Sequence, residues 1–177
     1  MLPVVVVLDN IRSLYNTGSI FRTADACGVE RLMLCGITPR PDQGSRQRRA
    51  IAKTALGAED AVRWEYAPAA AAALQTLKAG GYQVIAVEPA VDGVNLFECT
   101  PRWPVCLVFG HERMGVAADL AGHVDAFVRI PMLGKKGSLN VATAAGVVLY
   151  ELLRRRLYSD RSYSDGSANP STAGTDR

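Results

Sequence analysis

The stretch of sequence that decides the fold is IPMLGKKGSLNVATAAG, residues 130–146. It begins as the end of an apolar run, passes through a segment rich in glycine and lysine, and continues into a long apolar pattern behind Ser138 and Asn140. A serine at the start of a helix can cap it, and helix N-termini can also hold anions. The stretch therefore predicts a strand, a binding loop capped by Ser138 and a helix over residues 139–158.

Apolar runs and helical patterns alternate along the rest of the chain. We expect strands at residues 4–8, 31–35, 62–66, 82–87, 105–109 and 126–132, and further helices at residues 16–27, 68–78 and 116–122. Asn16 is expected to cap the first helix, and residues 36–49 are expected to form a polar loop. The uninterrupted run at 105–109 is typical of a central strand. This alternation predicts an α/β domain with a mostly parallel sheet flanked by helices.

The composition is that of a globular protein, because 49% of the 177 residues are hydrophobic and 21% are charged. The net charge of +3 permits a nucleic-acid partner without arguing for one. The N-terminal sequence lacks the pattern of a signal peptide, and no apolar run approaches the roughly 18 residues that span a membrane. The four cysteines form no CxxC pair, which predicts reduced thiols and no zinc site. We expect a cytoplasmic protein with one domain, residues 1–158, and a disordered polar tail, residues 159–177.

Two further loops have the composition of binding sites. FGHERMG, residues 109–115, follows the most apolar strand, and ligands of open α/β sheets lie beyond the carboxyl ends of the strands. Gly110 would let a ligand approach the backbone, and Glu112 adds a carboxylate. NIRSLYNTGSIFRTADACG, residues 10–28, places Asn16 and Arg22 on the first helix. Taken alone, the first loop could be a plain turn with a solvated glutamate, and Arg22 could be a solvated or interface residue.

Basic residues gather between the second and third expected strands. The members of this basic cluster are Arg40, Arg46, Arg48, Arg49 and Lys53. The alternative is a solvated surface without a partner, and phosphate contact is the functional interpretation. The string GKKGS does not match the phosphate-loop pattern GxxxxGK[ST], and GxGxxG is absent, so neither nucleotide-binding motif is supported.

Three motifs together, in this order, resemble the signatures of the SpoU (TrmH) family of RNA ribose 2′-O-methyltransferases in the SPOUT superfamily. The first is N-x-G-x-x-x-R, here NTGSIFR at residues 16–22. The second is FGxExxG, here FGHERMG at 109–115, and the third is IPMxGxxxSLNVxxA, here residues 130–144. The stretch KTALGAE, residues 53–59, is also similar to the family, and the resemblance extends over residues 2–157.

The resemblance implies an α/β fold with a deep C-terminal trefoil knot, a homodimer, and S-adenosyl-L-methionine as the cofactor. The implied cofactor-binding residues are Phe109, Gly110, Gly115, Ile130, Met132 and Leu139. The implied catalytic residues are Arg22, Asn16, Ser138, Asn140 and Glu112. Arg22 would act on the proton of the ribose 2′-hydroxyl or orient that hydroxyl, since an arginine is normally fully protonated. No metal is implied.

The remaining roles follow from the same resemblance. Asn16 would position Arg22 or the substrate, Ser138 and Asn140 would contact a substrate phosphate and brace the knot, and Glu112 would support the loop. The RNA could be a tRNA or an rRNA. The residues expected to bind it are Arg12, Arg40, Arg46, Arg48, Arg49 and Lys53. Two alternatives stay open: a non-catalytic RNA-binding protein on the same fold, and a methyltransferase that acts on a substrate other than RNA.

Overall fold

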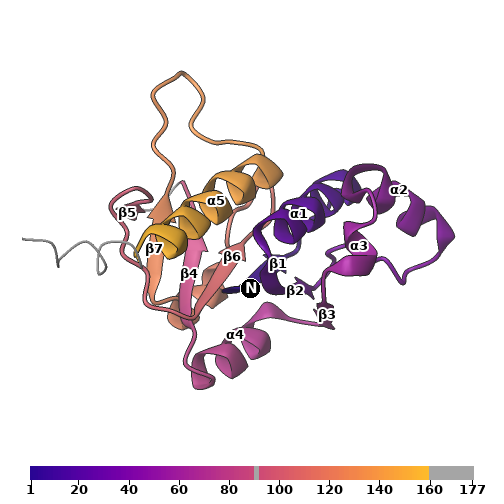
Figure 1. Ribbon diagram of the computed structural model, residues 1–177, viewed down its shortest axis with the longest axis horizontal. Helices are drawn as coiled ribbons and strands as arrows, with labels where there is room; N and C mark the ends of the chain where they lie inside the picture. Colours follow the sequence, from indigo (N-terminus) through magenta and orange to yellow (C-terminus); the bar gives the residue numbers. More distant parts are fainter. Residues whose placement is uncertain (90–91, 160–177) are drawn as a thin grey trace, which may run out of the picture.

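The computed structural model describes residues 1–89 and 92–159 (Figure 1). Within this part of the chain, seven strands form one parallel sheet in the order β3-β2-β1-β6-β4-β7-β5. The strands are β1 Leu2–Asp9, β2 Val29–Cys35, β3 Trp64–Ala67, β4 Gln83–Val87, β5 Val94–Asn95, β6 Val105–Phe109 and β7 Ala126–Arg129. The central place of β6, which is buried at every position, is confirmed. The predicted α/β architecture is confirmed with it.

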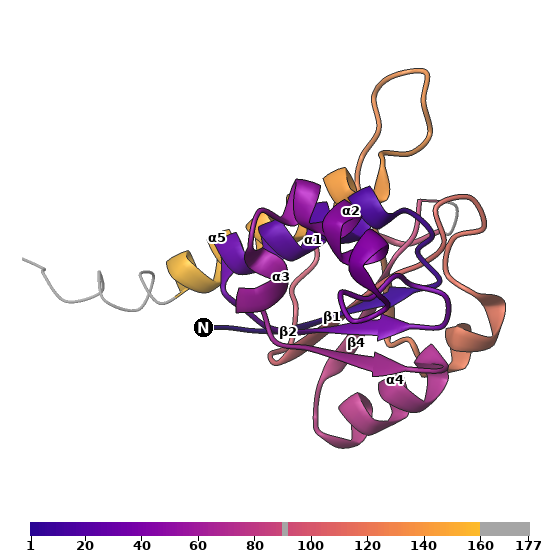
Figure 2. The same cartoon turned by 90° about the vertical axis from the view of Figure 1, so that its right-hand side faces the viewer.

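Helices cover both faces of the sheet, which is why the central strands are continuously apolar. The helices are α1 Leu14–Cys27, α2 Ser45–Ala55, α3 Ala58–Ala61, α4 Ala70–Ala79, the 3₁₀ helix η1 Ala118–His123 and α5 Val141–Ser159. Alternate residues of a strand face opposite sides. Val4 and Val6 of β1 accordingly pack in the core with α1, α2 and α5, whereas Val5 and Val7 pack with α4 and η1. Figure 2 shows these two layers on opposite sides of the sheet.

The predicted polar loop over residues 36–49 is partly wrong, because helix α2 begins at Ser45. Only Ile51 and Ala55 of this helix are buried. Its sequence therefore lacks the repeated apolar positions from which a helix is predicted. Three of the predicted loop arginines, Arg46, Arg48 and Arg49, therefore lie on a helix. The sequence also missed the two-residue strand β5, and the helix expected at 116–122 is a short 3₁₀ helix.

The N-termini of two helices differ from the predictions. Ser13, and not Asn16, caps α1, because its side chain accepts the backbone amide of Asn16 at 3.2 Å. The last helix begins at Val141, and Asn140 caps it by accepting the amide of Ala142 at 2.9 Å. In both cases two polar residues lie near the start of the helix, and the pattern alone does not say which side chain turns back to the amides.

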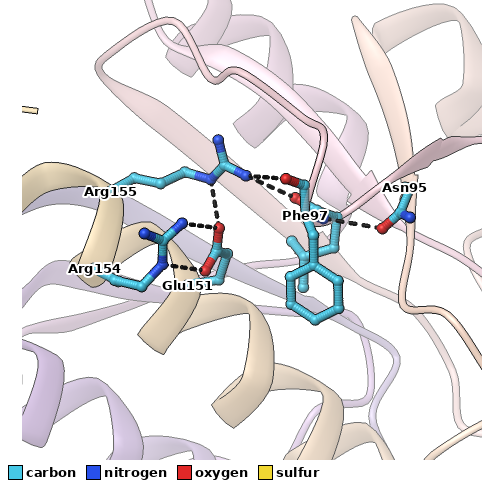
Figure 3. A network of polar contacts seen from close by, with 6 residues as sticks. Asn95, Phe97, Glu151, Arg154 and Arg155 are labelled. Atoms are coloured by element: carbon cyan, nitrogen blue, oxygen red, sulfur yellow. Dashed lines mark hydrogen bonds and ion pairs between the residues drawn. The ribbon is translucent and has the colours of Figure 1, made fainter. Parts of the chain in front are cut away.

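The far end of α5 is tied to the edge of the sheet by an ion-pair network (Figure 3). Glu151 accepts hydrogen bonds from Arg154 and Arg155, and Arg155 donates to the carbonyl of Phe97 at 2.7 Å. Phe97 lies in the turn that follows β5, so the network fixes α5 against the edge formed by β5 and β7. The predicted tail begins at the last residue of α5, and residues 160–177 lie outside the described part.

Candidate cofactor and substrate site

A cavity of about 380 Å³ lies where β4, β6 and β7 end and α5 begins. This is the edge of a parallel sheet at which α/β proteins bind ligands. All six predicted cofactor-binding residues line it: Phe109, Gly110, Gly115, Ile130, Met132 and Leu139. They come from two segments, residues 109–115 and 130–139, which the fold brings to opposite parts of one cavity wall.

The two glycines of the FGHERMG loop allow the loop to close on itself. A Cβ on Gly110 would lie 2.2 Å from the carbonyl oxygen of Gly115, which no real contact permits. Gly115 has a φ of 72°, a left-handed conformation that favours glycine. The sequence predicted that Gly110 lets a ligand approach the backbone. The structure shows that a glycine is also needed at this position for the loop to pack against its own residue Gly115.

A chain of hydrogen bonds joins the three motifs beside the cavity. Glu112 accepts the backbone amides of Arg12 and Ser13 at about 3.1 Å and the side-chain amide of Asn16 at 3.2 Å. Asn140 in turn donates to the side-chain oxygen of Asn16 at 3.1 Å. Residues more than a hundred positions apart in the sequence thus meet at one point. Three of the predicted catalytic residues, Asn16, Glu112 and Asn140, form this chain.

The carboxylate of Glu112 is held in its ionised form. Partial burial acts to raise its pKa, but the amides of Arg12 and Ser13 and the side chain of Asn16 outweigh burial, and the pKa falls below the ordinary value. Hydrogen bonds that favour the charged form have this effect. A carboxylate that accepts several donors and holds its proton weakly is suited to fixing a loop rather than to removing a proton.

Two other predicted catalytic residues lie differently. Ser138 lines the cavity and is exposed, so its hydroxyl is accessible to a ligand. Arg22 is exposed on α1 and borders a separate hollow together with Leu56 and Gly57. Within one copy of the chain the structure therefore does not bring Arg22 to the cavity that Ser138 borders.

Five of the six predicted RNA-binding residues fall into two groups. Arg40 lies over the ring of Tyr66 at 4.1 Å and pairs with Asp42, and Arg48 pairs with Asp60 at 2.7 Å. The exposed residues Arg46, Arg49 and Lys53 have no carboxylate partner within residues 1–89 and 92–159. Their spacing of three and four residues places these three on one face of α2, away from the buried Ile51 and Ala55. Arg12 is exposed beside Glu112.

Sequence reasoning missed two charged residues of the cavity wall, Glu88 and Arg113. Glu88 directly follows β4, which is the position at which a parallel strand presents a side chain to a ligand. That signal was present in the sequence, since the strand was predicted to end at Val87. Arg113 lies inside the FGHERMG motif, at a position that the motif leaves open.

The described residues contain no cluster of three or more histidine, cysteine or acidic side chains that could hold a metal ion. Among the helices in this part of the chain, none is long and apolar enough to cross a membrane.

Comparisons with known proteins agree with the geometry. Residues 3–150 match the model of the SpoU rRNA Methylase family. A relative named 23S rRNA (guanosine-2′-O-)-methyltransferase RlmB, from Pseudomonas aeruginosa, is 32% identical over 154 residues, which are 87% of this chain and 60% of that protein. The chain spans about three fifths of the length of the curated relatives that it matches first.

Solved structures show the same fold. The AdoMet-bound rRNA methyltransferase from Sinorhizobium meliloti superposes with a TM-score of 0.77 at 32% identity, over 87% of this chain and 56% of that one. A second structure, described as giving insights into the 2-OH methylation of C/U34 on tRNA, has a TM-score of 0.74 at 29% identity and covers 88% of this chain and 97% of its own. With two motifs lining one cavity, the first motif hydrogen-bonded to both of them, and a family match over most of its length, this chain belongs to the SpoU rRNA Methylase family.

Proposed function

We propose that the protein transfers a methyl group from S-adenosyl-L-methionine to a ribose 2′-hydroxyl of a tRNA or an rRNA. The observation that carries this proposal is the cavity at the ends of β4, β6 and β7, which all six predicted cofactor-binding residues line. The relative from Pseudomonas aeruginosa is named as a guanosine-2′-O-methyltransferase of 23S rRNA, and one structure concerns 2-OH methylation of a tRNA. These names support the same class of substrate for this chain.

The cavity suits the cofactor in size and in chemistry. Its volume of about 380 Å³ lies within the range of small-molecule sites. Val87, Phe109 and Ile130 supply an apolar wall for the adenine ring, and the loops at Gly110 and Leu139 supply backbone polar groups. When bound, S-adenosyl-L-methionine supplies a methyl group on a sulfonium, which is already activated for transfer.

The residues around the hydrogen-bonded chain are placed to handle the substrate. A ribose hydroxyl is a weak acid, so its proton must be removed or its oxygen activated during transfer. Ser138 can donate to or accept from a phosphate or hydroxyl at the cavity mouth. Asn140 donates to Asn16, and Asn16 donates to Glu112, so the part of the two asparagines is to keep the mouth of the cavity in shape.

The position of Arg22 favours an active site to which two copies of the chain contribute. It is exposed on α1 and lies away from the cavity of its own copy, so it can act on the substrate only if a second copy brings it there. Exposed apolar side chains on α1 and α5, such as Tyr15 and Tyr150, suit such a homodimer. An arginine is a poor proton acceptor, so Arg22 would hold the phosphate and polarise the hydroxyl rather than accept the proton.

The direct test is to incubate the protein with S-adenosyl-L-methionine that carries a labelled methyl group, together with bulk tRNA or bulk rRNA. Label in RNA that resists alkaline cleavage at the modified nucleotide is the expected result, because a 2′-O-methyl group blocks that cleavage. Ser138→Ala is the matched variant, since it removes one hydroxyl from the cavity mouth without touching the core. Calorimetry that detects no binding of the cofactor or of its demethylated product, with no label in either RNA, would exclude the proposed activity.

A further inference from the structure

Glu88 is a buried carboxylate in the wall of the candidate cofactor cavity. It follows β4 directly, only 9% of its surface is exposed, and it lies between Val87 and Pro89, which also line the cavity. Burying a carboxylate is costly unless hydrogen-bond donors surround it. None of the three family motifs includes this residue, so its presence in the wall calls for a role of its own.

The loop opposite Glu88 is shaped around the carboxylate. The oxygen Oε2 accepts the backbone amide of Val116 at 2.9 Å. A Cβ on the neighbouring Gly115 would lie 2.1 Å from the same oxygen, so only glycine leaves room for the carboxylate at this point. The C-terminal end of the FGHERMG loop therefore packs against Glu88, and this contact fixes the carboxylate at the cavity wall.

The cavity has a second carboxylate, Glu112, but it faces a different partner. Glu112 accepts the backbone amides of the two residues before α1 and the side chain of Asn16 in its first turn, at the rim of the cavity. Glu88 instead belongs to the end of a central strand, beside the apolar Val87 and Phe109. A carboxylate offers about four lone-pair sites, so Glu88 can accept donors from a ligand in addition to those that the protein provides.

We infer that Glu88 binds the cofactor by accepting hydrogen bonds from the two hydroxyls of its ribose. This inference rests on the proposed function. The hydroxyls of a ribose are two neighbouring donors, and the two oxygens of a carboxylate match such a pair in one plane. The apolar side chains around Glu88 suit the adjoining adenine, and a site poor in water strengthens the hydrogen bonds that it holds. Glu88 is therefore a cofactor-binding residue outside the three motifs.

The variant that tests this role is Glu88→Gln. Glutamine keeps an oxygen that can accept the amide of Val116, so the loop retains its anchor, but it replaces the other acceptor by an NH₂ donor. Binding of S-adenosylhomocysteine and of its 2′-deoxyribose analogue is measured by calorimetry with both proteins. Glu98→Gln, at an exposed carboxylate outside the cavity, is the matched control. Urea unfolding of each variant shows whether the fold is intact.

The wild-type protein should bind S-adenosylhomocysteine about tenfold or more tightly than Glu88→Gln does, as expected for hydrogen bonds to a charged acceptor. The deoxy analogue should lose affinity for the wild type but little further affinity for the variant, because the contact is already missing. Equal affinities of wild type and Glu88→Gln would overturn this inference alone. So would a loss seen with S-adenosylmethionine and not with S-adenosylhomocysteine, which would place the carboxylate at the sulfonium. A wild-type protein that binds neither ligand would overturn the proposed function as well.

Discussion

Asn16 lies in the first turn of α1, yet its side chain acts outside that helix. It donates to Glu112 and accepts from Asn140, while Ser13 satisfies the backbone amide of Asn16. The same residue thus connects the first motif to the other two. Its importance at the residue scale comes from these two contacts, because they hold three distant segments at one edge of the cavity.

Glu112 should make the stability of the protein depend on pH. Its pKa is lowered in the folded state, so its contribution is present above the unfolded pKa, about 4.3, and is lost as the pH falls through the folded value. At neutral pH we expect Glu112→Gln to lower the free energy of unfolding by about 1 kcal/mol, the low end for charged hydrogen bonds at a solvent-exposed site. Urea unfolding of both proteins between neutral and acid pH measures this difference, which should shrink in acid. Parallel curves over the whole range would contradict the assignment.

Gly18 should be required for the packing of two helices. A Cβ at this position would lie 2.2 Å from the hydroxyl of Thr54 and 2.3 Å from the backbone oxygen of Ile51, both on α2. We expect Gly18→Ala to lower the free energy of unfolding by about 1–3 kcal/mol, the usual cost of overpacking. Gly122→Ala is the control, because nothing lies within 4 Å of its added Cβ. Equal urea midpoints for the two variants would show that α2 moves aside without cost.

At the scale of elements, α2 is where sequence and structure differ most. It is a polar helix with one narrow buried face, and its exposed face carries the three basic residues that no described carboxylate pairs with: Arg46, Arg49 and Lys53. The ion pairs of Arg40 and Arg48 remove those two from the set of free cations that the sequence suggested. The candidate RNA-binding surface is therefore a stripe along a helix, which holds its charges at fixed spacing.

Replacing Arg46, Arg49 and Lys53 together by alanine should weaken RNA binding and flatten its dependence on salt. Each phosphate contact that is lost should reduce the slope of log K against log salt by about 0.7–0.9, because fewer counterions are released. The control is the triple alanine variant of Arg48, Arg63 and Arg154, which loses the same charge from residues that already pair with carboxylates. Filter binding over a series of salt concentrations compares them. Equal slopes for the two variants would show that only net charge matters.

At the scale of the whole molecule, the cavity and Arg22 lie apart within one copy of the chain. The cavity is built at the carboxyl ends of the strands, whereas Arg22 borders a hollow beside the end of α2. A second copy is the simplest way to bring the two together. The homodimer thus follows from the mechanism proposed for Arg22, and both can be tested in one experiment.

Arg22→Ala and Ser138→Ala should each abolish methyl transfer, and co-expression of the two variants should restore part of it. In a mixed dimer with shared sites, one site carries both substitutions and the other carries neither. Sedimentation velocity should show a dimer for each variant, and cofactor affinity of Arg22→Ala should stay within a few fold of the wild type. Mixed dimers without activity would show that each site draws Arg22 and Ser138 from the same copy.

Much of the architecture could be predicted from local patterns. The central strands were recognised because burial on both faces demands continuous apolar runs. The second and third motifs located the cavity because each lies at the end of such a run. Helix α2 escaped because only Ile51 and Ala55 face the core, and β5 because two residues carry no periodicity. Glu88 was missed for another reason. It follows a predicted strand, but the sequence does not show whether the side chain of a single glutamate at that position points into the cavity or into solvent.

By itself, the sequence determined the class of fold, two of the segments that form the cavity and the family to which the chain belongs, since these depend on periodicity and on short ordered motifs. Only the tertiary structure decided which side chains meet. It joined Asn16 to Glu112 and Asn140, placed Glu88 in the cavity wall and left Arg22 outside it. Contacts between residues a hundred positions apart depend on how parallel strands are ordered in the sheet and how helices pack over them, and no local pattern encodes that order.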